Sequence, residues 1–154
     1  MAFPDSCIRG ISNCDCLLEG GAVAYMTLFD FHSSPLRNDG WTEESINWMD
    51  DEHALGFTLN QVKESGDPQF KMGVAILPRV ELDRIRRRHG FAGHFGYERA
   101  PLEGNQYHGN LLLRDDISKP LKNMIRSALA LAAQIVPREG GYLGTSDSVQ
   151  DRNK

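Results

Sequence analysis

The sequence predicts an α+β domain with a mixed or mostly antiparallel sheet and a long C-terminal helix packed on one face of it. The chain has 154 residues, of which 40% are hydrophobic and 25% charged, and these values are ordinary for one globular domain. Short apolar runs typical of strands are interspersed with segments of helical spacing, without the regular strand–helix alternation of a parallel sheet. We therefore expect one domain over residues 1–136 and a flexible tail over residues 137–154.

The first elements are a strand over residues 7–12 and a turn or short helical segment over residues 13–21. Residues 22–31 give the most convincing strand of the chain. Both of its faces are apolar, which is typical of a central strand that is covered on two sides. A polar loop follows over residues 32–40.

Residues 41–51 admit two interpretations. Thr42, followed by two glutamates, resembles the N-cap and acidic first turn of a helix, and we favour a helix or turn here. The segment from Ser45 to Trp48 alternates polar and apolar residues, however, so it also fits a short strand. In that strand Ser45 and Asn47 share one face.

Five further elements are predicted after this segment: a helix over 52–64, a strand over 69–77, a short basic helix over 79–88, and two strands over 94–99 and 106–113. The last two strands form a hairpin, because the residues between them are rich in turn formers. The final helix has the clearest signals. Ser118 is its N-cap, Pro120 lies in its first turn, and apolar residues from Leu121 to Val136 repeat at helical spacing.

Charge is unevenly distributed along the chain. The net charge is −4, but the first 62 residues hold 10 acidic and 2 basic side chains, whereas the rest hold 11 acidic and 15 basic. The acidic cluster comprises Asp39, Glu43, Glu44, Asp50, Asp51 and Glu52, and the basic cluster Arg79, Arg84, Arg86, Arg87 and Arg88. An acidic chain is a poor nucleic-acid binder, and no series of stacking aromatics accompanies the arginines. The pattern predicts either two solvated faces that attract each other weakly or a dipolar surface that fits a protein partner.

The chain carries no membrane or export signal of the usual kind. Its longest unbroken apolar run, residues 128–133, is far shorter than the ~20 residues of a membrane helix. The start lacks the pattern of a signal peptide, and an odd number of cysteines favours the cytoplasm. Cys14 and Cys16, with Cys7 or His32, have the residue types of metal ligands but not the spacing of a zinc site. We therefore expect buried thiols and no metal.

Familiar catalytic motifs are absent from the sequence, so the candidate site consists of single polar side chains in apolar surroundings. Arg9 lies in a short apolar strand, where it either pairs with an acid or binds a phosphate or carboxylate of a ligand. Ser45 and Asn47 either belong to a polar turn or orient a ligand through neutral hydrogen bonds.

The predicted hairpin adds three candidates on one face. If residues 101–105 form the loop, Glu98 faces His108, and the carboxylate favours the protonated imidazole. Glu98 and His108 are then candidate catalytic residues, with Asn110 as a ligand-binding neighbour. The alternative is that this is the solvent side of an edge hairpin.

Two resemblances follow from these residues. The ordered set Arg9-Gly10-Ile11, Ser45-Ile46-Asn47-Trp48 and Asn105-Gln106-Tyr107-His108 resembles a group of small uncharacterised bacterial and phage-encoded proteins, over residues 7–136. This resemblance implies no activity, but it implies a place in host–phage or toxin–immunity systems. The order of Arg9, Ser45 and Glu98 is also similar to that in ADP-ribosyltransferase-like enzymes, which implies that Arg9 holds an NAD phosphate and that Glu98 polarises a nucleophile or the ribose hydroxyl.

Two functional hypotheses result. The first is a cytoplasmic binding or accessory module, without a cofactor, that contacts a protein partner through its asymmetric charge. The alternative is a small enzyme that acts on NAD or a nucleotide through Arg9, Ser45, Glu98 and His108. Convergence of Arg9, Asn47, Glu98 and His108 in one concave pocket would favour the enzyme, and an exposed apolar patch the binding module.

Overall fold

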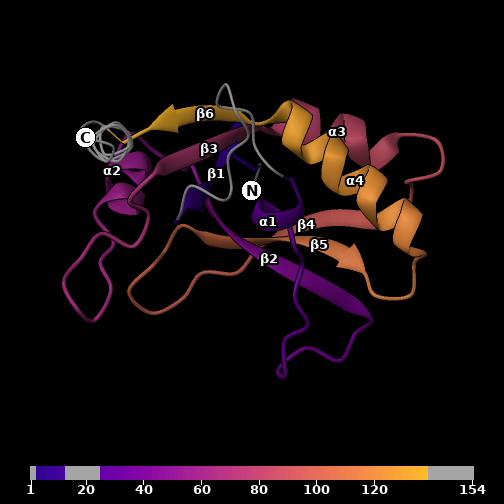
Figure 1. The fold of residues 1–154 in the computed structure, drawn as a ribbon, viewed down its shortest axis with the longest axis horizontal. Helices are drawn as coiled ribbons and strands as arrows, with labels where there is room; N and C mark the ends of the chain where they lie inside the picture. Colours follow the sequence, from indigo (N-terminus) through magenta and orange to yellow (C-terminus); the bar gives the residue numbers. More distant parts are fainter. Residues whose placement is uncertain (1–2, 13–24, 139–154) are drawn as a thin grey trace, which may run out of the picture.

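The computed structural model of the chain describes residues 3–12 and 25–138, and it is α+β (Figure 1). Six strands form one sheet in the order β4-β5-β2-β1-β3-β6, and every neighbouring pair is antiparallel. The strands are β1 (Ser6–Ile11), β2 (Trp41–Trp48), β3 (Gly73–Pro78), β4 (Phe95–Arg99), β5 (His108–Arg114) and β6 (Gln134–Pro137). The expected α+β class with a mostly antiparallel sheet is therefore confirmed.

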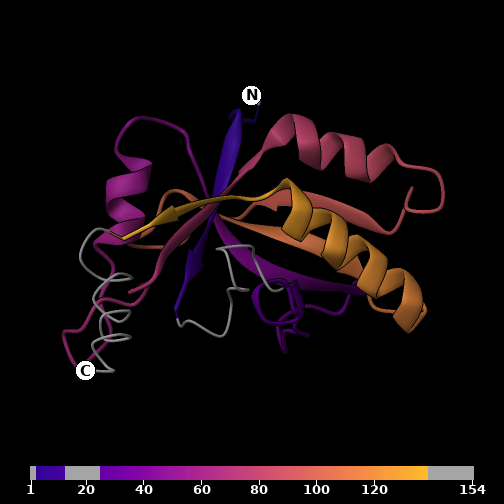
Figure 2. The same cartoon turned by 45° about the horizontal axis from the view of Figure 1, so that its top comes forward.

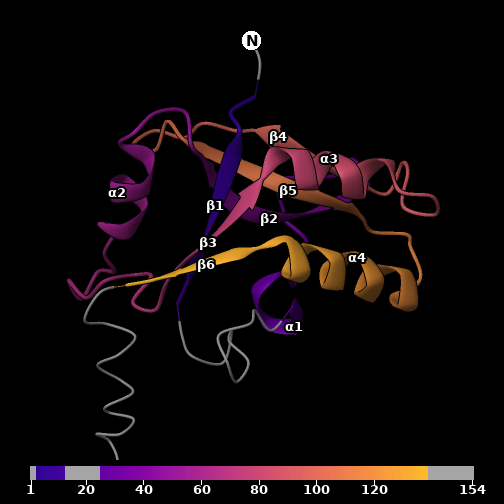
Figure 3. The ribbon, with the colours of Figure 1, turned by 90° about the horizontal axis from the view of Figure 1, so that it is seen from above.

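Four helices accompany the sheet within the described residues. They are α1 (Tyr25–Leu28), α2 (Ala54–Leu59), α3 (Arg79–Arg87) and α4 (Lys119–Ala132). Figures 2 and 3 show α2 at one end of the molecule, well apart from α3 and α4. No helix in this part of the chain is both long and apolar enough to cross a membrane.

The main core lies on the face of the sheet that packs against α1, α3 and α4. Alternate residues of each strand point into it, including Cys7 of β1, Trp48 of β2 and Leu111 of β5. Leu82 of α3 and Leu129 of α4 close the core from the helical side, and neither is exposed to solvent. Burial of these side chains is the main stabilising contribution to the fold.

The opposite face of the sheet is covered only in part. A smaller apolar cluster of Ile8, Val74, Ala54 and Tyr107 packs β1 and β3 against α2. The strands β2, β5 and β4 continue beyond this cluster, and most of the side chains that they carry on this side are polar: Glu43, Ser45, Asn47, Glu98, His108, Asn110 and Arg114. This uncovered polar area, which we call the open face, carries the candidate site.

The apolar segment over residues 22–31 is not a strand. Its described part contains α1 and a bend, and residues 22–24 lie outside the described residues. Leu28, Phe29 and Phe31 are all buried in the main core, and Phe31 has a positive φ of 57°. The segment is apolar on two sides because a short helix and a sharp reversal of the chain insert into the core.

The segment after Asp39 is a strand rather than the helix that we favoured. β2 alternates between the two faces, with Ile46 and Trp48 in the main core and Ser45 exposed. The two glutamates that resemble a helical first turn are held by ion pairs instead, Glu43 with the nearby Arg37 and Glu44 with the distant Arg9. The helix predicted over 52–64 is only the six-residue α2.

The hairpin prediction was correct in its strands and wrong in its register. Leu102 and Asn105 pair with each other across a tight turn in which Gly104 has a φ of 84°, and the connection runs to Tyr107. Glu98 therefore faces Asn110, and Ala100 lies opposite His108. Because the shift is two residues, the same side chains still point to the same face.

The final helix begins as predicted and ends early. The Ser118 hydroxyl accepts a hydrogen bond from the Leu121 N–H, which confirms the N-cap. After Ala132 the backbone becomes extended, and Ile135 and Val136 belong to β6, which pairs with β3. The predicted tail also begins too early, because Pro137 pairs with Gly73 of β3 and Arg138 donates to Phe70 O.

Three other elements predicted from the sequence are present in the structure. The strands over 7–12 and 69–77 and the basic helix over 79–88 are confirmed as β1, β3 and α3, although β3 starts only at Gly73. The segment over 13–21 and residues 139–154 lie outside the described residues.

Candidate functional site

The open face carries two adjoining cavities between α2 and the loop over residues 32–40. The first has a volume of about 350 Å³, and its lining includes Arg9, Ser45, Asn47, Asn105 and His108. The second has a volume of about 390 Å³, and its lining includes Arg37, Glu43, Glu98, His108 and Asn110. His108 lines both cavities, so it lies at their boundary. Volumes of this size suit small molecules.

Ser45 and His108 form a polar pair at this boundary. β2 and β5 are neighbours, and the Ser45 Oγ lies 3.4 Å from the Nε2 of His108. The Nδ1 of His108 lies 2.8 Å from the Ala100 carbonyl oxygen. A carbonyl oxygen only accepts, so Nδ1 carries the proton and donates. In the neutral ring Nε2 is then an acceptor that faces the Ser45 hydroxyl.

The side chain of Asn47 is buried and hydrogen-bonded within the protein, so it is not free to contact a ligand. Its Nδ2 donates to Thr58 Oγ1 at 2.9 Å and to Gln61 Oε1 at 3.4 Å, and its Oδ1 accepts from Asn105 Nδ2 at 2.9 Å. These bonds join β2 to α2 and to the turn before β5. The side chain that we expected to contact a ligand therefore fixes the wall of the first cavity.

Arg9 forms the floor of the first cavity and is already paired. β1 and β2 part after the pairing of Ile8 with Asn47, and the Arg9 side chain fills the gap. Its Nη2 lies 2.5 Å from Glu44 Oε2, its Nε donates to Leu28 O at 3.0 Å, and its Nη1 donates to Ser45 O at 3.0 Å. The guanidinium thus supports the backbone of the strand that presents Ser45.

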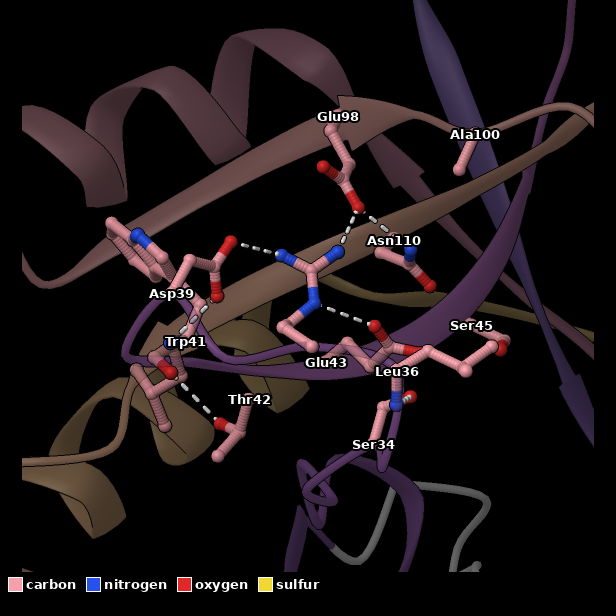
Figure 4. A network of polar contacts seen from close by, with 12 residues as sticks. Ser34, Leu36, Asp39, Trp41, Thr42, Glu43, Ser45, Glu98, Ala100 and Asn110 are labelled. Carbon is pink, nitrogen blue, oxygen red and sulfur yellow. Dashed lines mark hydrogen bonds and ion pairs between the residues drawn. The ribbon is translucent and has the colours of Figure 1, made fainter.

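Arg37 is the centre of the second cavity, and Figure 4 shows the carboxylates of Glu98, Glu43 and Asp39 converging there. Arg37 pairs closely with Glu98, with Glu43 at 2.8 Å and with Asp39 at 3.0 Å. Burial by itself lowers the pKa of Arg37, but hydrogen bonds and attraction from these carboxylates outweigh it, so the pKa is raised. Glu98 thus forms an ion pair with Arg37, and not with His108 as we expected.

Asn110 completes the second cavity. Its Nδ2 donates to Glu98 Oε2 at 2.8 Å, and it lies directly opposite Ser45 in the β2–β5 register. Its Oδ1 is buried and has no hydrogen-bond partner within the described part of the chain. Figure 4 shows this oxygen on the side of Asn110 that faces Ser45. A buried acceptor of this kind is uncommon and raises the question of a bound donor.

Several members of the acidic and basic clusters pair with residues outside the opposite cluster. Asp50 pairs with Arg99 at 2.7 Å, while Asp51 accepts from Tyr107 Oη at 3.0 Å. Burial and this hydrogen bond raise the pKa of Tyr107. The arginines of α3 pair locally, for example Arg84 with Glu81 at 2.5 Å. Within the described residues, no ion pair joins the acidic cluster to the basic cluster.

The predicted residues divide between the cavities. Arg9, Ser45, Asn47 and His108 line the first, and Glu98 and Asn110 join His108 in the second. Sequence reasoning missed Arg37, Thr58 and Gln61. For Arg37 a signal existed, because Arg9 and Arg37 are the only basic residues among the first 62, and both pair with the acidic cluster.

No metal centre is formed by the described residues, because no three His, Cys, Asp or Glu side chains gather there in a suitable arrangement. Cys7 is a buried free thiol, and burial raises its pKa. Cys14 and Cys16 lie outside the described residues.

Comparisons of the chain with protein-family models, with curated proteins and with solved structures find no match. The geometry of the open face is therefore the basis for a functional assignment.

Proposed function

We propose that the protein is a small enzyme that cleaves an ester of an uncharged molecule, with Ser45 as nucleophile and His108 as general base. One observation carries this proposal: the Ser45 Oγ lies 3.4 Å from His108 Nε2 while the Ala100 carbonyl holds Nδ1. A nucleophile, a base and a group that orients the base are the three parts of such a centre. A long contact is usual when no substrate is bound.

The reaction follows from these positions. Ser45 Oγ attacks the ester carbonyl carbon, and its proton passes to His108 Nε2. The tetrahedral intermediate then expels the alcohol, which takes that proton from Nε2. Water, deprotonated by His108, attacks the acyl-serine and releases the carboxylic acid and Ser45.

The charges around the pair favour an uncharged substrate. Arg9 and Arg37 are the arginines that line the two cavities, and the carboxylates there are Asp39, Glu43, Glu98 and Glu103. Both arginines are already in ion pairs. A diphosphate such as that of NAD needs free cations, so this lining argues against the nucleotide-acting alternative and for a neutral ester.

A serine-directed fluorophosphonate probe tests the proposal. We expect it to label Ser45, and we expect Ser45→Ala to abolish both labelling and the hydrolysis of short p-nitrophenyl esters. His108→Gln should slow both by about 10²–10⁴-fold, the usual contribution of a general base. Ser65→Ala, at an exposed serine away from the cavities, is the control. Labelling that persists in Ser45→Ala, or a normal rate in His108→Gln, would show that this pair is not a catalytic centre.

A second candidate function, a cytoplasmic binding module of a host–phage or toxin–immunity system, is favoured by one surface of α4. Met124 and Leu131 lie one heptad apart and are 52% and 86% exposed. A cavity of about 260 Å³ is lined by Leu131 of α4, by Glu81 and Arg84 of α3, and by Arg88, which follows α3. Apolar anchors beside Arg88, with Arg84 already paired to Glu81, suit an amphipathic partner helix with acidic flanks, whereas a second copy of this chain would bring the two Arg88 side chains together.

Synthetic amphipathic peptides separate this second function from the first. A leucine-striped peptide flanked by glutamates should bind the protein, and the same peptide flanked by lysines should not, as measured by fluorescence anisotropy. Met124→Glu with Leu131→Glu should abolish binding. Equal binding of both peptides, or binding of neither, would reject the surface as an acidic-helix site.

A further inference from the structure

The lining of the first cavity differs from that of the second in being mainly uncharged. Carboxamides dominate its polar part, and Phe70 and Leu102 contribute apolar surface. From this lining we infer that the first cavity binds a nucleobase-type heterocycle, flat and uncharged, which forms part of the alcohol half of the ester. The inference rests on the proposed function for the reaction, but the binding of the base does not depend on it.

The carboxamides offer free hydrogen-bonding groups, and two of them, Gln61 and Asn105, are held in place by Asn47. Asn47 is saturated and holds Gln61 and Asn105 in place, so their remaining groups are available. Asn105 uses one of its two Nδ2 protons on Asn47, and within the described residues neither Gln61 Nε2 nor the side chain of Gln69 has a protein partner. Carboxamides present a donor and an acceptor side by side, which matches the edge of a base.

Phe70 provides a flat wall for such a ring. A Cβ at Gly10 would lie 2.2 Å from the Phe70 ring, so the ring rests directly on the backbone of β1. Leu102 is more than half exposed and lines the same cavity. Aromatic and apolar walls bind the faces of a base, while amides bind its edge.

The charged residues that line the first cavity favour a nucleoside over a nucleotide as its ligand. Arg9 is held by Glu44, and Glu103 adds a negative charge to the rim. A 5′-phosphate would gain no unpaired cation here and would meet that carboxylate. The cavity of about 350 Å³ is at the lower end of the range for small-molecule sites, which also favours a nucleoside-sized group.

Calorimetric titration of the Ser45→Ala protein tests the inference without any catalytic turnover. The probes are adenosine, guanosine, cytidine and uridine, their 5′-monophosphates, and an N-acetylated dipeptide amide as another source of amide edges. We expect at least one nucleoside to bind with a Kd below about 1 mM, and its monophosphate to bind more weakly. Gln61→Leu and Gln69→Ala should each weaken binding about tenfold, and Leu131→Ala, on the opposite helical side, should not.

Three results would overturn the inference: no saturable binding of any nucleoside, tighter binding of a monophosphate, or equally tight binding of the dipeptide amide. Gln69 is exposed, so Gln69→Ala keeps the test valid if Gln61→Leu fails to fold. Probe labelling of Ser45 in the wild-type protein is measured separately. Labelling without nucleoside binding would reject the inference alone, and nucleoside binding without labelling would reject the proposed reaction alone.

Discussion

Replacing Arg9 with Met should lower the free energy of unfolding by about 3–5 kcal/mol, the usual cost of removing one partner of a buried ion pair. Glu44 is only 4% exposed and Arg9 20%, so solvent screens the remaining carboxylate little. One oxygen of Glu44 also accepts the N–H of Phe31 at 2.8 Å, which holds the carboxylate in place after Arg9 is removed.

A double-mutant cycle separates this pair from its surroundings. Glu44→Gln keeps an acceptor for the Phe31 N–H and removes the charge, so Arg9→Met combined with Glu44→Gln should be less destabilised than the sum of the two single variants, by about 1–3 kcal/mol. Urea unfolding with an unchanged m-value gives the free energies. The control is Arg99→Met, which breaks the pair with Asp50, whose side chains are 29% and 26% exposed, and should cost less, about 0–1 kcal/mol.

Either of two results would contradict this role of the Arg9–Glu44 pair. A cost below about 1 kcal/mol for Arg9→Met would mean that Glu44 is hydrated or relocates once it is unpaired. Strict additivity in the cycle would mean that Arg9 acts through its bonds to Leu28 O and Ser45 O rather than through Glu44.

Three further predictions concern α4, β4 and α3. Leu129→Asp should destabilise the fold by at least about 4 kcal/mol because it buries an unpaired charge, whereas Leu131→Asp should change the melting temperature little; equal effects would show that α4 is not part of the core. Burial and the hydrogen bond to Asp83 raise the pKa of Tyr97 above its ordinary value of 10.0, so its contribution to stability is complete below pH 10 and is lost as the pH rises through the folded value. Tyr97→Phe should therefore flatten the fall in melting temperature above pH 10, and an unchanged slope would contradict the assignment. The arginines of α3 should not confer tight binding to duplex or single-stranded nucleic acid at physiological salt in a mobility-shift assay, and a stable complex there would refute this expectation.

Local signals predicted the elements whose interactions are local. The N-cap at Ser118 and the amphipathic spacing of α3 and α4 depend on neighbours within one or two turns, and both helices are present. β2 shows the limit of this reasoning. Its glutamates resemble a helical first turn, but β2 pairs with β1 and β5, and Glu44 forms an ion pair with Arg9, 35 residues before it, so interactions that are distant in the sequence place them in a strand.

The candidate site was predicted residue by residue but not as an arrangement. Ser45 and His108 could be selected because they interrupt apolar strands. Their contact depends on β2 pairing with β5, which joins segments more than 50 residues apart and leaves no local trace. The register error at Glu98 has a similar cause, because the length of the connection is set by the turn around Gly104.

The position of β6 has a consequence for the order in which the sheet is completed during synthesis. β3 lies between β1 and β6, and β6 follows every other described strand in the sequence. Until residues 134–137 have been made, one edge of β3 presents unpaired N–H and C=O groups, which is the type of surface that pairs with other chains. A nascent or truncated chain that stops within α4 should therefore aggregate through β3, even though the residues of the open face are all present.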